Sequence, residues 1–270
     1  GLSGNASAVD LSLHAATSAI AMVGGQAKIE AGGLYVTAAT SNQLSVSGQS
    51  LGNAGALGSL DLTARQTTRA IVESGATLVL GSGTNPPAMS LLLEAVDRSS
   101  FSTRLAVDDS ATTGDDDLNR ARSTISLERS AEAILLGREI NVPAVDGAAA
   151  SVRLQPVTAS GKVQLSAVLA DGASGGVRGV IDSDRFGQHA TSTRDTVTVQ
   201  VRDVDLSASA FLAYAQNQSS LLAQAKQASN EAAGLLSAVP PEGGSAQVLP
   251  SVSVLIANTH LTAAGLAQLI

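Results

Sequence analysis

The chain has 270 residues and a formal net charge of −7, with no Cys, no Trp, two Tyr and three Phe. The acidic balance argues against nucleic acid as a partner, because phosphates are bound by clustered Lys and Arg, and the absence of Cys excludes disulfides and thiolate metal sites. No stretch approaches about 20 unbroken apolar residues, so the sequence predicts no membrane span. The composition is 44% hydrophobic but 2% aromatic, which favours a long, narrow aliphatic core over a compact globule filled by aromatic rings.

The N-terminal part of the chain alternates apolar and small polar residues in short runs. Period-2 runs bounded by Gly, Asn and Ser are typical of strands, and they occur at 10–13, 18–23, 27–31, 34–38 and 43–47. Corners between these strands are predicted at Gly24-Gly25, Gly32-Gly33 and Gly48. One strand of this kind cannot bury its apolar face alone, so we expect successive coils to stack on one another.

Internal repeats support this stacking. The motif at 10–13 (DLSL) recurs at 61–64 (DLTA) and again at 124–127 (TISL). A fainter echo of 9–12 appears at 204–207 (VDLS), and 252–256 resembles the start of another unit. The pattern indicates a degenerate unit of roughly 50 to 60 residues with variable insertions.

An acidic segment at 108–119 is the strongest candidate for a metal site. Oxygen ligands for a hard cation such as Ca²⁺ could come from Asp108, Asp109, Asp115, Asp116 and Asp117. The segment lacks the spacing of an EF-hand loop and the nonapeptide repeat of calcium-binding solenoids. A solvated loop is the alternative interpretation, and no other cofactor is expected.

Other reactive side chains form no pattern that predicts catalysis. Paired carboxylates for sugar cleavage would have to face each other across a cleft, and the possible members are Glu94, Asp97, Asp182 and Asp184. The histidines are far apart in sequence and are expected on the surface or in loops rather than in a metal site; they are His14, His189 and His260. We therefore expect no enzymatic activity.

The composition changes near residue 209. Ala, Gln and Leu, which are strong helix formers, dominate the segment that follows. An apolar stripe with helical spacing runs through Phe211, Tyr214, Leu221, Leu222, Ala225, Ala228, Ala232 and Leu235, and two prolines follow at 240 and 241. The pattern predicts a helical insertion at 209–237, packed on the side of the stack or capping it.

These features together predict an all-β fold, a right-handed parallel β-helix (β-solenoid) with a helical insertion. Residues 1–208 would form the solenoid coils, 209–237 the helix, and 238–270 a linker and a resumed coil. Because both ends of the sequence fall inside the repeating pattern, we expect the chain to be a segment of a longer protein.

Two modules carry a resemblance to a known family. The segments 61–78 (DLTARQTTRAIVESGATL) and 27–40 (AKIEAGGLYVTAAT) resemble the β-helical stalk regions of large bacterial filamentous haemagglutinin-like adhesins. The resemblance is one of repeat style and covers the segments 8–206 and 251–270. It implies export to the cell exterior, a fibrous shape, and a role in adhesion or in the extracellular matrix.

The leading functional hypothesis is a structural segment of an extracellular fibre or adhesin stalk at the bacterial cell surface. Its expected partners are further copies, or further coils of the same chain, packed end to end. A carbohydrate-binding or carbohydrate-cleaving β-helix, with surface glycans as partners, is the second hypothesis. A self-assembling filament or surface-layer subunit is the third.

Overall fold

A computed structural model of the chain describes residues 5–6, 10–51, 59–81, 87–108, 121–145, 149–183, 187–227 and 245–270. The described residues form strands joined by short corners and contain no helix. Every pairing among these strands is parallel except that of β10 (Glu139–Val142) with β11 (Ser151–Ala159). The all-β prediction with parallel sheets is therefore confirmed.

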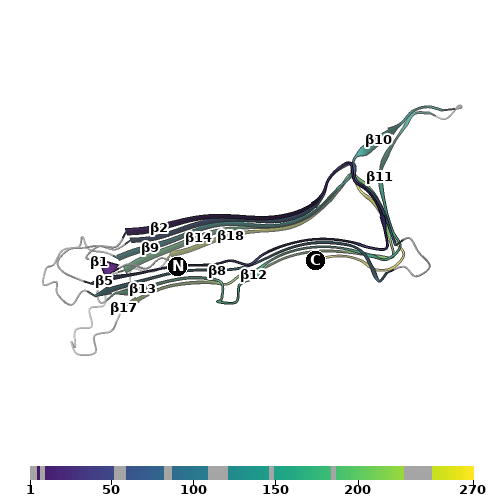
Figure 1. Ribbon diagram of the computed structural model, residues 1–270. Helices are drawn as coiled ribbons and strands as arrows, with labels where there is room; N and C mark the ends of the chain where they lie inside the picture. The colour runs from purple at the N-terminus through teal and green to yellow at the C-terminus, as the bar shows by residue number, and fades with distance from the viewer. Residues whose placement is uncertain are drawn as a thin grey trace.

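The strands belong to three sheets (Figure 1). The first, here called the long sheet, contains β2 (Asp10–Val23), β6 (Ser59–Val72), β9 (Ala121–Leu136), β14 (Gly187–Arg202) and β18 (Ser245–Ala257). The second, the end sheet, contains β3 (Lys28–Ala31), β7 (Thr77–Leu80), β11, β15 (Val204–Ala208) and β19 (His260–Ala263), with β10 attached to β11.

The third sheet, the return sheet, has nine strands. Its path includes β8 (Met89–Asp108), whose length lets it pair with two shorter strands in sequence, β4 (Leu34–Thr40) and β5 (Gln43–Leu51). The other members are β1 (Asn5–Ala6), β12 (Lys162–Asp171), β13 (Val177–Ser183), β16 (Ala210–Gln218), β17 (Leu221–Gln227) and β20 (Ala267–Leu269).

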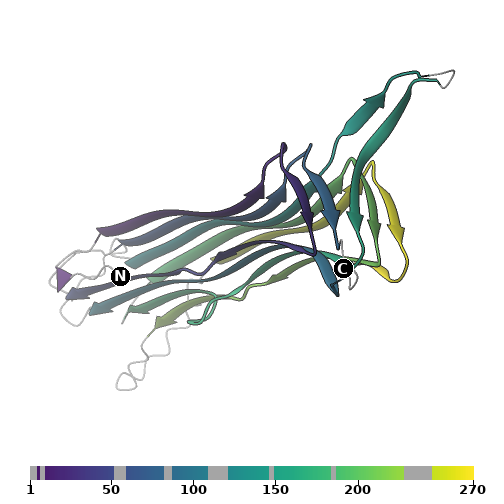
Figure 2. The same ribbon diagram turned by 45° about the vertical axis from the view of Figure 1, so that its right-hand side comes forward.

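The chain visits the three sheets in a fixed order and then repeats the circuit. It runs through the long sheet, crosses the end sheet, returns through the third sheet and starts the next circuit beside the previous one (Figure 2). In the long sheet, Asp10 faces Ser59, Ser59 faces Arg122, and Arg122 faces Gln188. Each facing residue therefore lies one circuit further along the chain.

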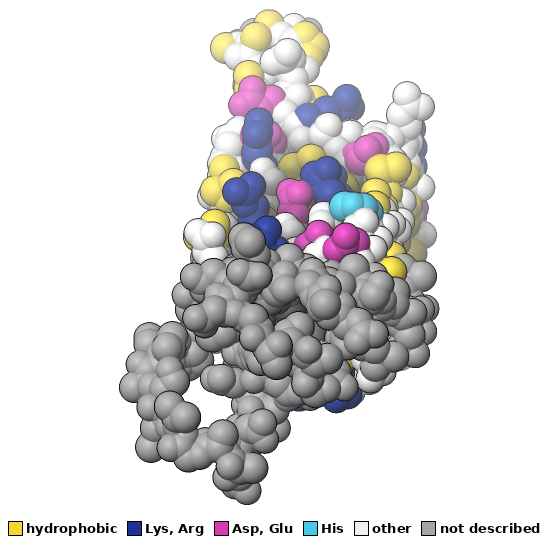
Figure 3. Space-filling model, turned by 90° about the vertical axis from the view of Figure 1, so that its left-hand side faces the viewer, with side chains coloured by type: hydrophobic (Ala, Val, Ile, Leu, Met, Phe, Trp, Pro, Cys, Tyr) yellow, Lys and Arg dark blue, Asp and Glu magenta, His cyan; other side chains and the backbone are white. Residues whose placement is uncertain are grey.

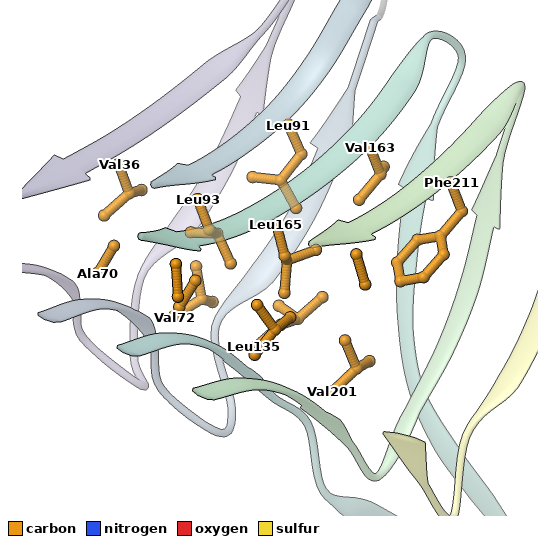
Figure 4. Close-up of a cluster of buried hydrophobic side chains, with 14 of the residues drawn as sticks. Val36, Ala70, Val72, Leu91, Leu93, Leu135, Val163, Leu165, Val201 and Phe211 are labelled. Atoms are coloured by element: carbon orange, nitrogen blue, oxygen red, sulfur yellow. The ribbon is translucent and has the colours of Figure 1, made fainter. Parts of the chain in front are cut away.

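Alternating side chains fill the narrow space between the long and return sheets. Figure 4 shows Ala70, Val72, Leu135 and Val201 of the long sheet pointing toward Val36, Leu91, Leu93, Val163, Leu165 and Phe211 of the return sheet. Removing a large aliphatic or aromatic side chain from water contributes roughly 1.5–3 kcal/mol. Because each circuit covers the apolar row of the one before it, the core is a continuous aliphatic column, as the composition predicts.

The corners between strands follow two of the three predicted glycine positions. Gly24 and Gly25 lie between β2 and β3, and Gly32 and Gly33 lie between β3 and β4, as predicted. Gly48 instead lies inside β5. In later circuits the corner after the long sheet contains residues with positive φ, namely Gly75 (95°), Asp203 (58°) and Asn258 (45°). These residue types adopt that left-handed conformation most readily.

The predicted helical insertion at 209–237 is wrong over the residues that the structure describes. Residues 210–218 and 221–227 form β16 and β17, and residues 228–237 lie outside the described part. In β16, Phe211, Ala213 and Ala215 are buried, whereas the residues between them are less so. Pairing along nearly the whole of β12 and burial of this face outweigh the helix propensity of Ala and Leu.

The repeat motifs are placed correctly in part. The match of residue 61 with residue 124 is confirmed, because Asp61 faces Thr124. The match of residue 10 with residue 61 is wrong by two positions, because Ser12 rather than Asp10 faces Asp61. The echo at 204–207 belongs to the end sheet and not to the long sheet of residues 10–12. The segment 252–256 lies in the last part of β18, the first strand of a further circuit, and is aligned with 19–23 of β2 rather than with the start of that strand.

Candidate functional site

A layer of polar side chains crosses the aliphatic core and divides it into two hydrophobic clusters. From the long sheet come Gln66, Arg129 and Asp195, which lie side by side on β6, β9 and β14 and point inward. One cluster of apolar residues lies on the side nearer the end sheet. The other lies beyond the layer and includes Leu62 and Phe101.

Arg129 and Asp195 form a fully buried ion pair at the centre of this layer. Arg129 Nε donates to Asp195 Oδ1 at 2.9 Å and Nη2 donates to Oδ2 at 2.6 Å, and both side chains are at most 1% exposed. The Arg129 guanidinium also lies 6.0 Å from the centroid of the Phe101 ring, within range of a cation–π interaction. The pair joins two neighbouring circuits through charge-assisted hydrogen bonds.

The return sheet and the residues beside it supply further donors to the same carboxylate. Asn217 Nδ2 and Ser219 Oγ each donate to Asp195 Oδ2 at 3.1 Å. Asp195 therefore accepts four hydrogen bonds, two from Arg129 and two from the opposite side of the core. A buried carboxylate needs this degree of satisfaction, because an ionised group that lost its partners would keep the full cost of desolvation.

Asp97 enters the polar layer from β8. Its Oδ1 accepts a hydrogen bond of 2.6 Å from Ser99 Oγ, and its side chain is buried. Burial raises the pKa of Asp97 above its ordinary value of 3.8, and the nearby Asp195 carboxylate acts in the same direction, although the Ser99 hydrogen bond and the Arg129 charge oppose them.

Several buried polar atoms of this layer have no hydrogen-bond partner within the described residues. They are both amide atoms of Gln66, Oδ2 of Asp97 and Nη1 of Arg129. Buried atoms of this kind are ordinarily satisfied by ordered water. The layer therefore combines the Arg129–Asp195 ion pair with buried donors and acceptors that no described residue satisfies.

The carboxylates considered for sugar cleavage do not meet at one surface site in the described structure. Asp97 points into the core, and Glu94, three residues earlier on β8, points to the opposite face of the strand. Asp182 belongs to β13, and Asp184 lies outside the described residues. Glu94 and Asp97, the two whose side chains are described, are not placed for general acid and base catalysis.

The acidic segment proposed for Ca²⁺ lies almost entirely outside the described residues. Asp108 is the last residue of β8, and Asp109, Asp115, Asp116 and Asp117 are not described. In the part of the chain that is described, no group of three or more His, Asp or Glu side chains is placed to hold a metal ion.

The three histidines occupy different environments. His14 is exposed on β2, whereas His260 Nδ1 lies 2.9 Å from Asp205 Oδ1 on the surface of the end sheet. His189 is buried, which corrects the expectation of a surface position. Its Nε2 lies 2.6 Å from Thr191 Oγ1, and burial lowers the pKa of His189 below 6.5.

Gly179 on the neighbouring β13 makes room for the His189 ring. A Cβ atom at position 179 would overlap the Cε1 and Nε2 atoms of that ring, so any larger residue there would force the histidine out of its place. The glycine is therefore required by the close approach of the His189 side chain from the opposite sheet and not by a turn.

A shallow groove of about 520 Å³ lies beside the β10–β11 hairpin, which projects from the rest of the molecule (Figure 1). It is lined by Ile140, Val142, Arg153, Leu154, Pro156, Asp205 and His260. The lining mixes aliphatic and charged side chains and includes the exposed His260–Asp205 pair. The described lining contains no aromatic platform of the kind on which sugars stack.

The outer strands of the stack present open edges. Among the described strands, β2 pairs only with β6, and β18 pairs only with β14. Apolar side chains are exposed at the β18 end, including Leu249, Val252 and Leu255 at 48–49%. Elsewhere, charges of both signs are interspersed, as Figure 3 shows for one end of the molecule, and Arg69 pairs with Glu132 across neighbouring circuits at 2.6 Å.

The polar layer was missed in the sequence, although it leaves a signal there. In 125–135, the inward positions read Ile, Leu, Arg, Ala, Ala, Leu, and in 191–201 they read Thr, Thr, Asp, Val, Val, Val. Charged residues of opposite sign on the inward tracks of two strands are the pattern that identifies such a pair. That Arg129 and Asp195 face each other follows from the register of β9 and β14 alone.

Comparisons with known proteins identify no relative: no family model, no curated protein and no solved structure matches the chain. The described part of the chain also contains no helix that could cross a membrane.

Proposed function

We propose that the chain is a structural segment of an extracellular fibre or adhesin stalk, built as a right-handed β-solenoid and acting as a non-catalytic rod at the bacterial surface. Its partners are further copies or further coils of the same chain, packed end to end, and the rod projects whatever it carries away from the cell. The site of action is then the pair of open edges rather than a cleft.

One observation carries this proposal. The inward rows of the long sheet continue from circuit to circuit without interruption, so that Ala21, Ala70, Ala133, Val199 and Val254 form one file across five strands. Each circuit adds about 4.8 Å to the stack and covers the apolar face of its neighbour. Such a file has no natural stopping point, which suits a rod that extends by repetition.

The interior also favours a mechanical role. The described polar groups considered for chemistry are either buried inside the column, as with Asp97, or separated on its surface. The interior ion pair and the cross-circuit Arg69–Glu132 pair tie neighbouring circuits together. These contacts resist separation of the circuits and present no substrate with a reactive group.

Electron microscopy tests the proposal. Antibodies raised against this chain should label thin, stiff fibres on the outside of intact producing cells, and the purified chain should give rods rather than globular particles. Labelling confined to the cell interior, or globular particles, would contradict the stalk. Release of reducing ends from a panel of bacterial polysaccharides would contradict the non-catalytic part and favour a carbohydrate-cleaving β-helix.

A further inference from the structure

We propose that the buried Arg129–Asp195 pair selects the register in which the circuits stack, by excluding the two registers displaced by two residues. The pair is the one place among the described inward rows of β9 and β14 where two charged side chains face each other inside the core. Its role is therefore to specify one stacking arrangement among several that the apolar rows would accept.

The alternation of side chains does not fix the register by itself. A shift of one residue turns every inward side chain outward and is excluded, but a shift of two keeps inward residues inward. The sequence displays this ambiguity, because its best internal match pairs residue 10 with residue 61, whereas the structure pairs Ser12 with Asp61. The two arrangements differ by two residues.

The apolar pairs of β9 and β14 would tolerate such a shift. Ala131 and Ala133 face Val197 and Val199, and after a displacement by two residues Ala133 would face Val197 or Val201, so apolar side chains would still meet there.

The ion pair does not tolerate the shift. Displacement in one direction would place Arg129 opposite Thr193 and Asp195 opposite Ala131. Displacement in the other direction would place Arg129 opposite Val197 and Asp195 opposite Leu127. Both charges would then be buried without each other, and at least one would lose its remaining partners across the core. Breaking a buried pair in this way disfavours the displaced register by roughly 100-fold or more.

Engineered disulfides report the register directly, because the chain contains no Cys. Ser126 and Ser192 face each other on the outer side of β9 and β14, at the spacing of about 4.8 Å between neighbouring strands. The pair Ser126→Cys with Ser192→Cys reports the native register. The pairs Ser126→Cys with Ala190→Cys or Arg194→Cys report the displaced registers, because in the native register their Cα atoms lie about 8 Å apart, beyond the reach of a disulfide.

Each reporter is unfolded in urea, refolded and oxidised in three backgrounds. With the native pair present, the Ser126–Ser192 reporter should cross-link and the displaced reporters should stay reduced. In the apolar background Arg129→Met with Asp195→Leu, the cross-linked fraction of a displaced reporter should rise at least tenfold. The exchanged pair Arg129→Asp with Asp195→Arg should restore the native pattern.

A neighbouring uncharged pair supplies the matched control. Exchanging volumes at the next inward position, with Ala131→Val and Val197→Ala, should leave the native cross-linking pattern unchanged. The proposal is overturned if the displaced reporters stay reduced in an apolar variant that remains folded by circular dichroism. Should that variant not fold, displaced cross-links in the exchanged variant would overturn it instead.

Discussion

His189 and Asp97 place two titratable side chains inside a column that is otherwise largely aliphatic, and they respond to pH in opposite directions. For His189, burial lowers the pKa below 6.5, so the unfolded chain takes up the proton first as the pH falls. The free energy of unfolding is therefore full above about pH 6.5 and declines as the pH falls from there toward the lowered pKa of the folded state.

Replacing His189 should remove this loss. We expect the His189→Gln variant, which can keep a hydrogen bond to Thr191, to lose less stability than the wild type between pH 7.5 and pH 5. Urea unfolding at the two pH values measures the difference. The exposed His14→Gln variant serves as the control and should behave as the wild type does. An equal loss in His189→Gln would show that the buried ring does not set the acid response.

The contribution of Asp97 to the free energy of unfolding depends on pH in the opposite direction. Because its pKa is raised above 3.8, the stability that it contributes is complete below pH 3.8 and is lost as the pH rises through the raised pKa. The Asp97→Asn variant keeps an acceptor for Ser99 and carries no charge. We expect its melting temperature to exceed that of the wild type at pH 8 and the advantage to disappear near pH 3. A lower melting temperature at pH 8, with Glu94→Gln as the control, would contradict this assignment.

At the scale of the element, β16 shows where local sequence reasoning stops. The strands from 10 to 47 could be predicted because apolar and polar residues alternate along them in step with their two faces, although the runs predicted at 10–13 and 18–23 are parts of one strand, β2. The segment from 210 to 218 is rich in Ala and Gln, which favour a helix. It pairs with β12, which begins far earlier in the chain at Lys162, so the signal that decides its structure is not local. The two-residue error in the first repeat match has the same origin, since a period of two cannot distinguish registers that differ by two.

The two aromatic residues of β16 separate the strand from the helix that its composition suggests. In a helix Phe211 and Tyr214 share one face, whereas in the strand Phe211 is 1% exposed and Tyr214 lies on the other side. Phe211→Ala should lower the free energy of unfolding by about 3–5 kcal/mol. Tyr214→Ala should cost about 1 kcal/mol or less, as partly exposed positions do. Similar losses in the two variants, measured by urea unfolding, would argue against the strand.

The polar layer depends on single residues and also on how the circuits are aligned. Its members could be recognised one at a time, as charged residues on inward tracks, but their meeting depends on circuits of unequal length. The circuit that brings Arg69 beside Glu132 is shorter than the one that brings Arg129 beside Asp195. Insertions such as the β10–β11 hairpin change the lengths of the circuits without disturbing the stack. The spacing of Arg129 and Asp195 in the sequence therefore does not predict their contact.

At the scale of the whole molecule, the open edges decide how the chain behaves in solution. On one side of β2 and of β18, the outermost strands of the long sheet, no described strand pairs with the row of backbone donors and acceptors. An exposed strand edge is a template for further pairing. At the β18 end the inward residue Val252 is 49% exposed, because no described circuit follows to cover it. At the β2 end, Ala19 occupies the same row of inward residues as Val252. Both ends therefore present an apolar side chain at this position.

The purified chain should therefore self-associate end to end, and one charge at the β18 edge should prevent it. We expect the weight-average mass by analytical ultracentrifugation to rise with concentration in the wild type and to stay near that of a monomer in Val252→Lys, because an inward-facing Lys at an edge blocks the next strand. Ser192→Lys adds the same charge to the exposed outer face of β14, within the stack, and should associate as the wild type does. A wild type that stays monomeric at high concentration would show that these edges do not pair and would contradict the proposed end-to-end extension.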